Sequence, residues 1–199
     1  MENITTKVLD NSFISACITD IKSHNIFELC NECYKLLSSP SVYEESKKLK
    51  GQISDDKLIE EQVIEEYYGK IEILDMAQDP KYNELLNYLE NRYPYLHRGE
   101  LSTYLIALIR FTEDDKFYFI TDDMQFRKKI PMLKNDPIFI KKLESEVKDI
   151  NISGTIGIIR RLREKNKLTS GDIEDIIVDL QNGSFYLTDY LLDYLRGNS

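Results

Sequence analysis

The stretch Phe117-Tyr118-Phe119-Ile120-Thr121-Asp122-Asp123-Met124-Gln125-Phe126 decides the fold of this chain. Its first five residues are aromatic or β-branched, which is typical of a strand buried on both faces. Such strands belong mostly to parallel sheets that helices cover on both sides. The strand ends at two adjacent carboxylates, and ligands of open parallel sheets bind beyond the carboxyl ends of the strands. The stretch therefore predicts a parallel sheet whose edge carries a cation-binding group.

Short apolar segments of this kind alternate with segments of helical periodicity along the whole chain. Strands are predicted at residues 7–9, 41–43, 71–74, 117–121 and 149–152. Helices are predicted at residues 13–21, 26–37, 80–92, 101–109, 124–130, 137–148, 155–167, 171–180 and 188–196. The alternation predicts an α/β protein in which a central parallel sheet is flanked by helices on both faces.

One part of the chain departs from this alternation. Residues 45–69 are dense in lysine and glutamate with few apolar positions, and predict exposed helix in two pieces that separate near Gly51. We interpret the chain as a single domain, residues 1–199, with a helical insertion at about residues 46–96.

Composition excludes several classes of protein. The 199 residues carry a formal net charge of −9, which argues against loose, charge-driven binding of nucleic acid over the whole surface. No apolar run is long enough to span a bilayer, and the first residues lack the pattern of a signal peptide. We therefore expect a cytoplasmic protein without a membrane partner.

The three cysteines do not predict a metal site. Cys30 and Cys33 form one Cys-x-x-Cys, Cys17 stands alone, and a zinc site needs a second pair of ligands. Free cysteine is among the most buried residue types, so core packing is the expected role.

Acidic residues follow several predicted strands or open the helices beside them. Each could be ordinary turn or cap chemistry, but the set points to one edge of the sheet. The acids are Asp10, Glu44 or Glu45, Glu100, Asp122 and Asp123. Carboxylates gathered in one crevice need a counter-charge, which Mg²⁺ or Mn²⁺ supplies. Such an ion could polarise a phosphodiester and activate water for in-line attack. Glu44 and Glu45 cannot be distinguished by the sequence.

Basic residues near these acids suggest a phosphate track. Candidates are Arg98, Arg127, Lys128, Lys129, Arg160, Arg161 and Arg163. A solvated helix face explains a charge run equally well. His97 is expected to be a surface residue and not a general base.

Four motifs together resemble the PIN-domain nucleases. They are Val8-Leu9-Asp10-Asn11-Ser12, Val42-Tyr43-Glu44-Glu45, Arg98-Gly99-Glu100 and Ile120-Thr121-Asp122-Asp123-Met124-Gln125-Phe126. The segments Ile152–Gly157 and Gly183–Thr188 are also similar to one PIN subfamily. The resemblance covers about residues 6–45 and 97–195.

The resemblance implies a Rossmann-like three-layer fold and a metal-dependent endoribonuclease that hydrolyses RNA phosphodiester bonds. It implies metal ligands at Asp10, Glu45 (or Glu44), Glu100 and Asp123, with Asp122 as a catalytic neighbour. The same resemblance implies substrate contacts at Asn11, Ser12, Arg98, Thr121, Arg127 and Lys128, where Thr121 would orient a phosphate or a metal-bound water. Many relatives are toxins of the VapC type that pair with a small antitoxin, and a homodimer is common among them.

Two other protein classes also carry acids at a strand end. Haloacid dehalogenase phosphatases need a second acid where this chain has Ser12, and phospho-receiver domains carry their acid pair early in the chain, not late. Both classes fit poorly. A different class is a non-catalytic PIN-like module that binds a protein partner through the helices at residues 45–96.

Overall fold

The computed structural model describes residues 5–54, 57–110, 117–144, 150–183 and 185–198. In chain order the elements are β1 (Thr6–Leu9), α1 (Asn11–Thr19), α2 (Ile26–Cys33), β2 (Lys35–Ser38), α3 (Pro40–Ser46), η1 (Lys47–Leu49), β3 (Ile53–Ser54), β4 (Lys57–Leu58), α4 (Glu61–Tyr68), β5 (Glu72–Ile73), α5 (Pro80–Arg92), α6 (Arg98–Arg110), β6 (Phe117–Ile120), α7 (Met124–Lys134), α8 (Pro137–Leu143), β7 (Asn151–Ser153), α9 (Thr155–Glu164), α10 (Ser170–Asn182) and α11 (Asp189–Arg196).

The central sheet has five parallel strands in the order β5-β2-β1-β6-β7, as the sequence predicts for the fold class. From β1 the chain winds outward to β2 and β5, then returns to place β6 on the other side of β1. The strand order therefore reverses between β1 and β6. Open parallel sheets form their binding crevice at such a switch point, beyond the carboxyl ends of the strands.

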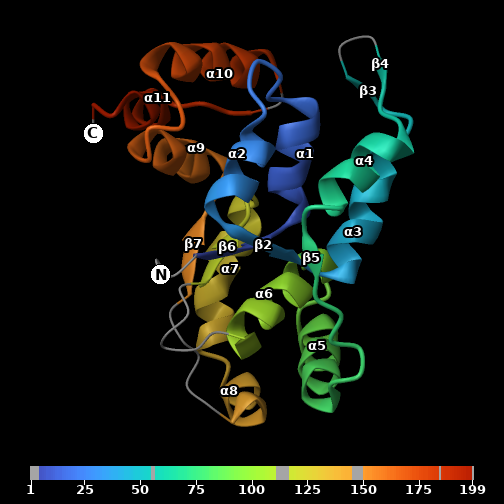
Figure 1. Ribbon diagram of the computed structural model, residues 1–199. Coiled ribbons are helices and arrows are strands. Elements are labelled where there is room, and N and C mark those ends of the chain that lie inside the picture. Colours follow the sequence, from blue (N-terminus) through green and yellow to red (C-terminus); the bar gives the residue numbers. More distant parts are fainter. Residues whose placement is uncertain (1–4, 55–56, 111–116, 145–149, 184, 199) are drawn as a thin grey trace.

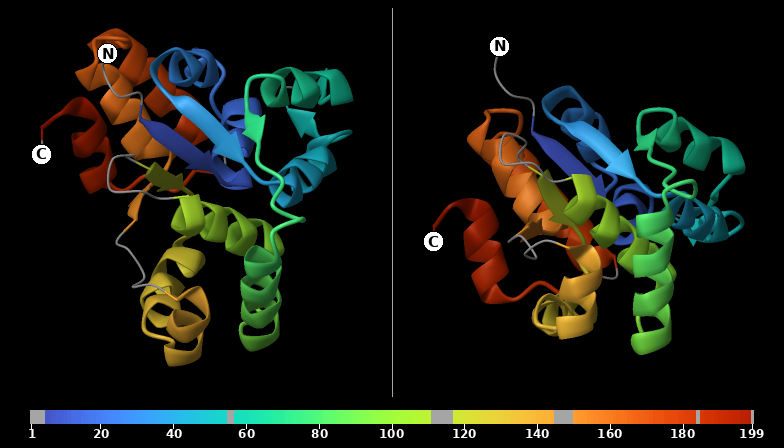
Figure 2. Two further views of the ribbon diagram at one scale, coloured as in Figure 1. Left: turned by 60° about the horizontal axis from the view of Figure 1, so that its bottom comes forward. Right: turned by 90° about the horizontal axis from the view of Figure 1, so that it is seen from below.

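Helices cover both faces of the sheet, which gives three layers (Figures 1 and 2). On one face α1, α2, α9 and α10 bury a core that includes Leu9, Leu36 and Ile120. On the other face α5, α6, α7 and α8 bury a core that includes Val8 and Leu37. Neighbouring residues of one strand point to opposite faces, so each buried strand feeds both cores.

The start of several helices follows from local capping chemistry. The Asp79 side chain accepts hydrogen bonds from the backbone of Lys81 and Tyr82, and Pro80 occupies the first helical position. Thr188 caps α11 by accepting a hydrogen bond from the Leu191 N–H. Both starts were predicted from the sequence.

The second predicted strand was wrong. The strand is Lys35–Ser38, and residues 41–43 belong to α3. Ser39 accepts a hydrogen bond from the Val42 N–H while Pro40 takes the first helical position, so these residues begin a helix where the sequence was read as ending one. The predicted helix 26–37 consequently ends at Cys33, before the strand.

The predicted end of a helix at Pro131 was also wrong, because α7 continues through it to Lys134. Proline removes one backbone hydrogen bond, but Ile130 and Leu133 on either side are buried against α8 and the core. That packing keeps the last turn helical.

The region read as a helical insertion contains strands as well. β5 joins the central sheet beside β2, while β3 and β4 form a separate antiparallel pair. The two exposed helical pieces predicted at residues 45–69 are α3 with η1, and α4. The predicted strand residue Asp149, the predicted helical residues 145–148 and Ser184 lie outside the described residues.

Cys17, Cys30 and Cys33 are free thiols. Of the Cys-x-x-Cys pair, Cys30 is buried in the core as expected, whereas Cys33 is half-buried against it. Across the described ranges, every helix is too short or too polar to cross a membrane.

Candidate active site

A cleft of about 1150 Å³ lies at the carboxyl edge of the sheet. Acidic side chains from separate elements line it, namely Asp10, Glu45, Glu100, Asp122 and Asp123. Tyr186 and Tyr190 belong to its lining as well. The residues that the sequence singled out from distant segments therefore share one cavity.

Asp10 sits at the switch point, directly after β1. Its backbone N–H donates to the Ile120 carbonyl at 2.9 Å, which extends the pairing of β1 with β6. One carboxylate oxygen, Oδ2, accepts hydrogen bonds from the hydroxyls of Ser12 at 3.0 Å and Thr121 at 2.9 Å. Only 4% of the residue is exposed. Burial raises the pKa of Asp10, and the negative charge of Glu45 raises it further. The hydrogen bonds from Thr121 and Ser12 lower it, but the net shift is upward.

Thr121 is hydrogen-bonded to both Asp10 and Asp123 and fixes their relative position. Its buried hydroxyl donates to Asp10 and accepts the Asp123 backbone N–H at 3.1 Å. Asp123 in turn begins α7 as its N-cap, and its Oδ1 accepts the N–H groups of Gln125 at 2.6 Å and Phe126 at 2.8 Å. In the Thr-x-Asp motif, Asp123 thus caps α7 and also contributes its carboxylate to the lining of the cleft.

Glu100 is a second acid of the group with a raised pKa. Burial, followed by the nearby charges of Asp10 and Asp123, raises the pKa of Glu100 to about 8. Its carboxyl shares a hydrogen bond with that of Asp123 and accepts the His97 backbone N–H at 3.3 Å. Three carboxylates therefore repel one another inside a partly dry crevice.

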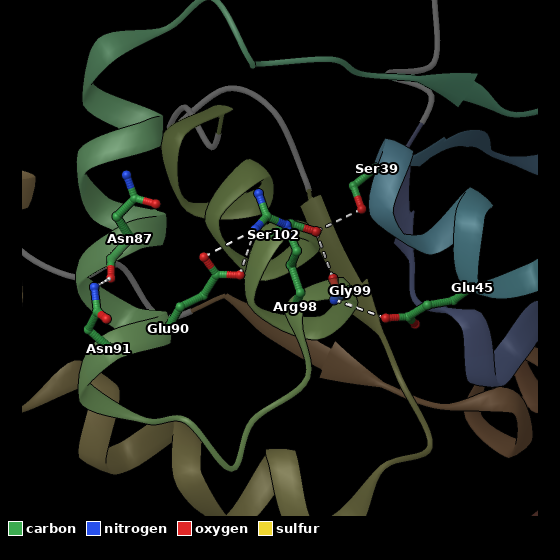
Figure 3. A network of polar contacts seen from close by, with 8 residues as sticks. All are labelled: Ser39, Glu45, Asn87, Glu90, Asn91, Arg98, Gly99 and Ser102. Carbon is green, nitrogen blue, oxygen red and sulfur yellow. Dashed lines mark hydrogen bonds and ion pairs between the residues drawn. The ribbon is translucent and has the colours of Figure 1, made fainter.

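Glu45, and not Glu44, belongs to this cleft. The Glu45 Oε1 accepts the Gly99 backbone N–H at 3.2 Å, at the start of α6 (Figure 3). A Cβ on Gly99 would lie 2.5 Å from the other oxygen of the same carboxylate, so glycine lets Glu45 approach the helix end. Glu44 is exposed and pairs with Lys47 at 2.6 Å.

Asp122 turns toward a different part of the structure. Its Oδ1 accepts the Thr155 backbone N–H at 2.9 Å, and its Oδ2 accepts the Thr155 hydroxyl. It thereby satisfies the start of α9, where Gly154 makes no side-chain cap. Burial raises the pKa of Asp122, while the bonds from Thr155 and the charge of Arg127 oppose that rise. Asp122 lines the cleft but organises the β7–α9 turn.

The predicted substrate residues divide into two groups. Asn11, Ser12, Thr121 and Arg127 lie at the acids, although the Asn11 Oδ1 accepts the Ser46 hydroxyl at 2.6 Å and the Arg127 guanidinium donates to the Thr121 carbonyl. Arg98 points away and pairs with Glu90 at 2.9 Å (Figure 3). Lys128 is exposed and does not line the cleft.

Sequence reasoning missed the aromatic part of the lining. Tyr186 is 84% exposed and Tyr190 66% exposed, and the ring of Tyr190 stacks on that of Tyr194 at 6.3 Å. Tyr190 and Tyr194 are four residues apart in α11 and therefore lie on one side of that helix, which is the signal that could have found them. Lys48 also lines the cleft and was not predicted.

The donor set fits a hard divalent cation in its chemistry. Carboxylate oxygens are the ligands that Mg²⁺ and Mn²⁺ prefer, and a cation would reverse the rise in pKa of Asp10 and Glu100. As the side chains stand, no three acid, histidine or cysteine side chains within the described part of the chain already form a metal-binding group. Binding would therefore require rotation of these carboxylates toward one another.

Comparisons with protein-family models, with curated proteins and with solved structures found no match to this chain.

Proposed function

We propose that this protein is a metal-dependent endoribonuclease related to the PIN-domain nucleases. One observation carries the proposal: Asp10, Glu45, Glu100 and Asp123 come from four separate elements and line one cleft at the switch point of a parallel sheet. Structural acids are normally paired with a base or spread over the surface. Here they line one cleft, and their mutual repulsion costs folding free energy unless a cation is bound.

Mg²⁺ or Mn²⁺ in this group would activate a water and stabilise the leaving oxygen of a phosphodiester. Asp10, Glu100 and Asp123 are the proposed ligands, and Glu45 extends the set on the α3 side. Thr121 positions Asp10 through its hydroxyl and holds the Asp123 backbone. The Ser12 hydroxyl donates a second hydrogen bond to the same oxygen of Asp10.

RNA is the proposed substrate because the cleft combines the acids with exposed aromatic rings. Nucleobases that are not paired stack on such rings, and the stacking tolerates any sequence. Tyr186 and Tyr190 offer two rings in the lining, and Lys48 and Arg161 add positive charge for phosphates. We therefore propose single-stranded RNA, or unpaired regions of structured RNA, as the substrate.

The same exposed tyrosines support a second candidate, a non-catalytic module that binds a protein partner such as a small antitoxin. The two candidates differ in their response to metal. Ligand binding to the folded state raises its melting temperature. An increase with Mg²⁺ or Mn²⁺ that disappears in Asp10→Asn favours the nuclease, and an unchanged melting temperature favours the module.

The direct test is cleavage of single-stranded and structured RNA with Mn²⁺ or Mg²⁺. We expect metal-dependent cleavage that Asp10→Asn and Asp123→Asn each reduce by at least about a hundredfold. Glu44→Gln is a matched control for Glu45→Gln, since it removes the neighbouring charge outside the cleft. Cleavage that survives in both aspartate variants, or that no metal supports in the wild type, would contradict the proposal.

A further inference from the structure

A second pocket, of about 230 Å³, lies beside the amino-terminal half of β1, away from Asp10. Lys7, Tyr34, Tyr118, Arg161, Glu164 and Lys165 contribute to its lining. Lys7 and Tyr34 do not line the acidic cleft, whereas Arg161 lines both cavities. The pocket is thus a separate site with its own charge.

Lys7 is a buried lysine with no carboxylate paired to it among the described residues. It is 1% exposed, and its Nζ lies 3.5 Å from the centroid of the Tyr118 ring and 4.6 Å from that of Tyr34. Ring faces attract an ammonium, but they leave its three N–H donors without an acceptor oxygen. No carboxylate of the described residues forms an ion pair with Lys7. A buried charge in this state is destabilising unless something pairs with it.

Tyr34 supplies a second unsatisfied donor in the same pocket. It is 6% exposed, and its hydroxyl is buried with no hydrogen-bond partner in the described structure. Buried polar groups are nearly always hydrogen-bonded, so an orphan of this kind indicates a missing partner. The Tyr34 hydroxyl and the Lys7 ammonium, which contacts aromatic rings, line one small pocket and point to one missing partner.

The charges around the pocket indicate the charge of the missing ligand. Burial lowers the pKa of Lys7, and the positive charges of Arg161 and Lys165 lower it further, to about 7. The Arg161 Nη1 donates to the Ser153 hydroxyl at 2.8 Å, which fixes the guanidinium beside the Tyr118 ring. The one carboxylate in the lining, Glu164, bonds to Arg160 at 3.0 Å. Positive charge therefore exceeds negative charge around the two orphan donors.

We propose that this pocket binds a phosphate-type anion, held by the Lys7 ammonium, the Tyr34 hydroxyl and the positive charge of Arg161 and Lys165. A phosphate dianion matches more than one cation and has enough acceptor oxygens to satisfy both orphan donors. A carboxylate carries one charge and would leave part of the cationic excess unpaired. The ligand is either free phosphate or the terminal phosphate of a monoester.

The test is titration of the full chain with inorganic phosphate by calorimetry and by thermal melting, in chloride buffer of constant ionic strength. We expect saturable binding and a rise in melting temperature for the wild type. Lys7→Met should weaken phosphate binding at least about tenfold, and Tyr34→Phe should weaken it several-fold. Lys7→Met should fold well, since it removes a buried unpaired charge, and should melt higher than the wild type without phosphate.

Lys141→Met is the matched control, because it removes the same charge from an exposed position on α8 and should bind phosphate like the wild type. Competition by adenosine 5′-monophosphate distinguishes the two sources: displacement of phosphate identifies a monoester head, and no displacement identifies the free anion. Absence of saturable phosphate binding to the wild type, or equal binding by Lys7→Met, would overturn the proposal.

Discussion

The Thr121 hydroxyl donates a hydrogen bond to the Asp10 carboxylate across 2.9 Å, joining residues that are 111 positions apart in the chain. The bond connects the ends of β1 and β6, the two strands between which the sheet order reverses. Because the same hydroxyl accepts the Asp123 N–H, one side chain sets the relative position of two candidate metal ligands.

Replacement of Thr121 tests this positioning. Thr121→Val keeps the shape of the side chain but leaves Asp10 without one donor, so we expect a loss of stability of about 1 to 3 kcal/mol. RNA cleavage should fall at least about tenfold, with a higher metal concentration needed for half-maximal activity. Thr121→Ser retains the hydroxyl and is the control that should keep most of the activity. Equal losses in both variants would count against a role for the hydroxyl.

The metal-free protein should become less stable as pH rises from about 5 to 8. Glu100 has a pKa of about 8 in the folded protein against an ordinary value of 4.5, so the folded state holds a proton that the unfolded state has lost. The contribution of this proton to the free energy of unfolding is fully present below pH 4.5 and is lost as the pH rises through 8. The raised pKa of Asp10 changes the stability in the same direction. We expect the melting temperature in EDTA to fall by about 5 to 10 °C over this range.

Two comparisons check the origin of that fall. Glu100→Gln should flatten the pH dependence, because its amide does not titrate. Excess Mn²⁺ should also flatten it in the wild type, since the cation pairs with the ionised carboxylates. A slope that is the same in Glu100→Gln would assign the effect to other groups.

Gly99→Ala should separate metal binding from stability. The new Cβ would displace the Glu45 carboxylate, which is the flexible end of a side chain, while alanine itself favours the helix by up to about 1 kcal/mol. We expect a melting temperature close to that of the wild type and a metal affinity several-fold weaker, measured by calorimetry. Gly171→Ala in α10 is the control, because only the Thr169 hydroxyl, at 3.7 Å, lies near its Cβ. Unchanged metal affinity in Gly99→Ala would remove Glu45 from the ligand set.

Substitutions of the neighbouring residues Asp122 and Asp123 should have opposite effects on stability and on metal affinity. Asp122→Ala removes both hydrogen bonds from Thr155, so we expect a loss of about 1 to 2 kcal/mol in urea denaturation with metal affinity largely retained. Asp123→Asn keeps an oxygen to cap α7, so stability should hold while metal affinity falls. Loss of metal affinity in Asp122→Ala at full stability would make Asp122 a ligand.

The aromatic lining should act on substrate binding. Tyr186→Ala and Tyr190→Ala should each raise KM for single-stranded RNA about tenfold with little change in kcat, as expected when a base loses its stacking partner. Tyr95→Ala removes an exposed ring outside the cleft and should leave KM unchanged.

The parallel sheet could be predicted from the sequence because its inner strands are short apolar runs with an acid or a cap after them. The same signal pointed to Asp10 and Asp123, whereas Glu100 was predicted from its place at the start of an apolar helix. The second strand was misplaced because Leu36 and Leu37 continue the apolar spacing of α2, so that one periodicity covers a helix and the strand after it. The choice between Glu44 and Glu45 depends on the approach of α3 to Gly99, a long-range contact that no local pattern encodes.

The order of the strands also has a consequence for how the protein is made. β1 and its acid are synthesised before Thr121, Asp123 and the β7–α9 turn that Asp122 bonds to. A chain still under synthesis has Asp10 without its partners. The proposed metal site is therefore incomplete until β6 has paired with β1, and a chain that stops before β6 cannot assemble it.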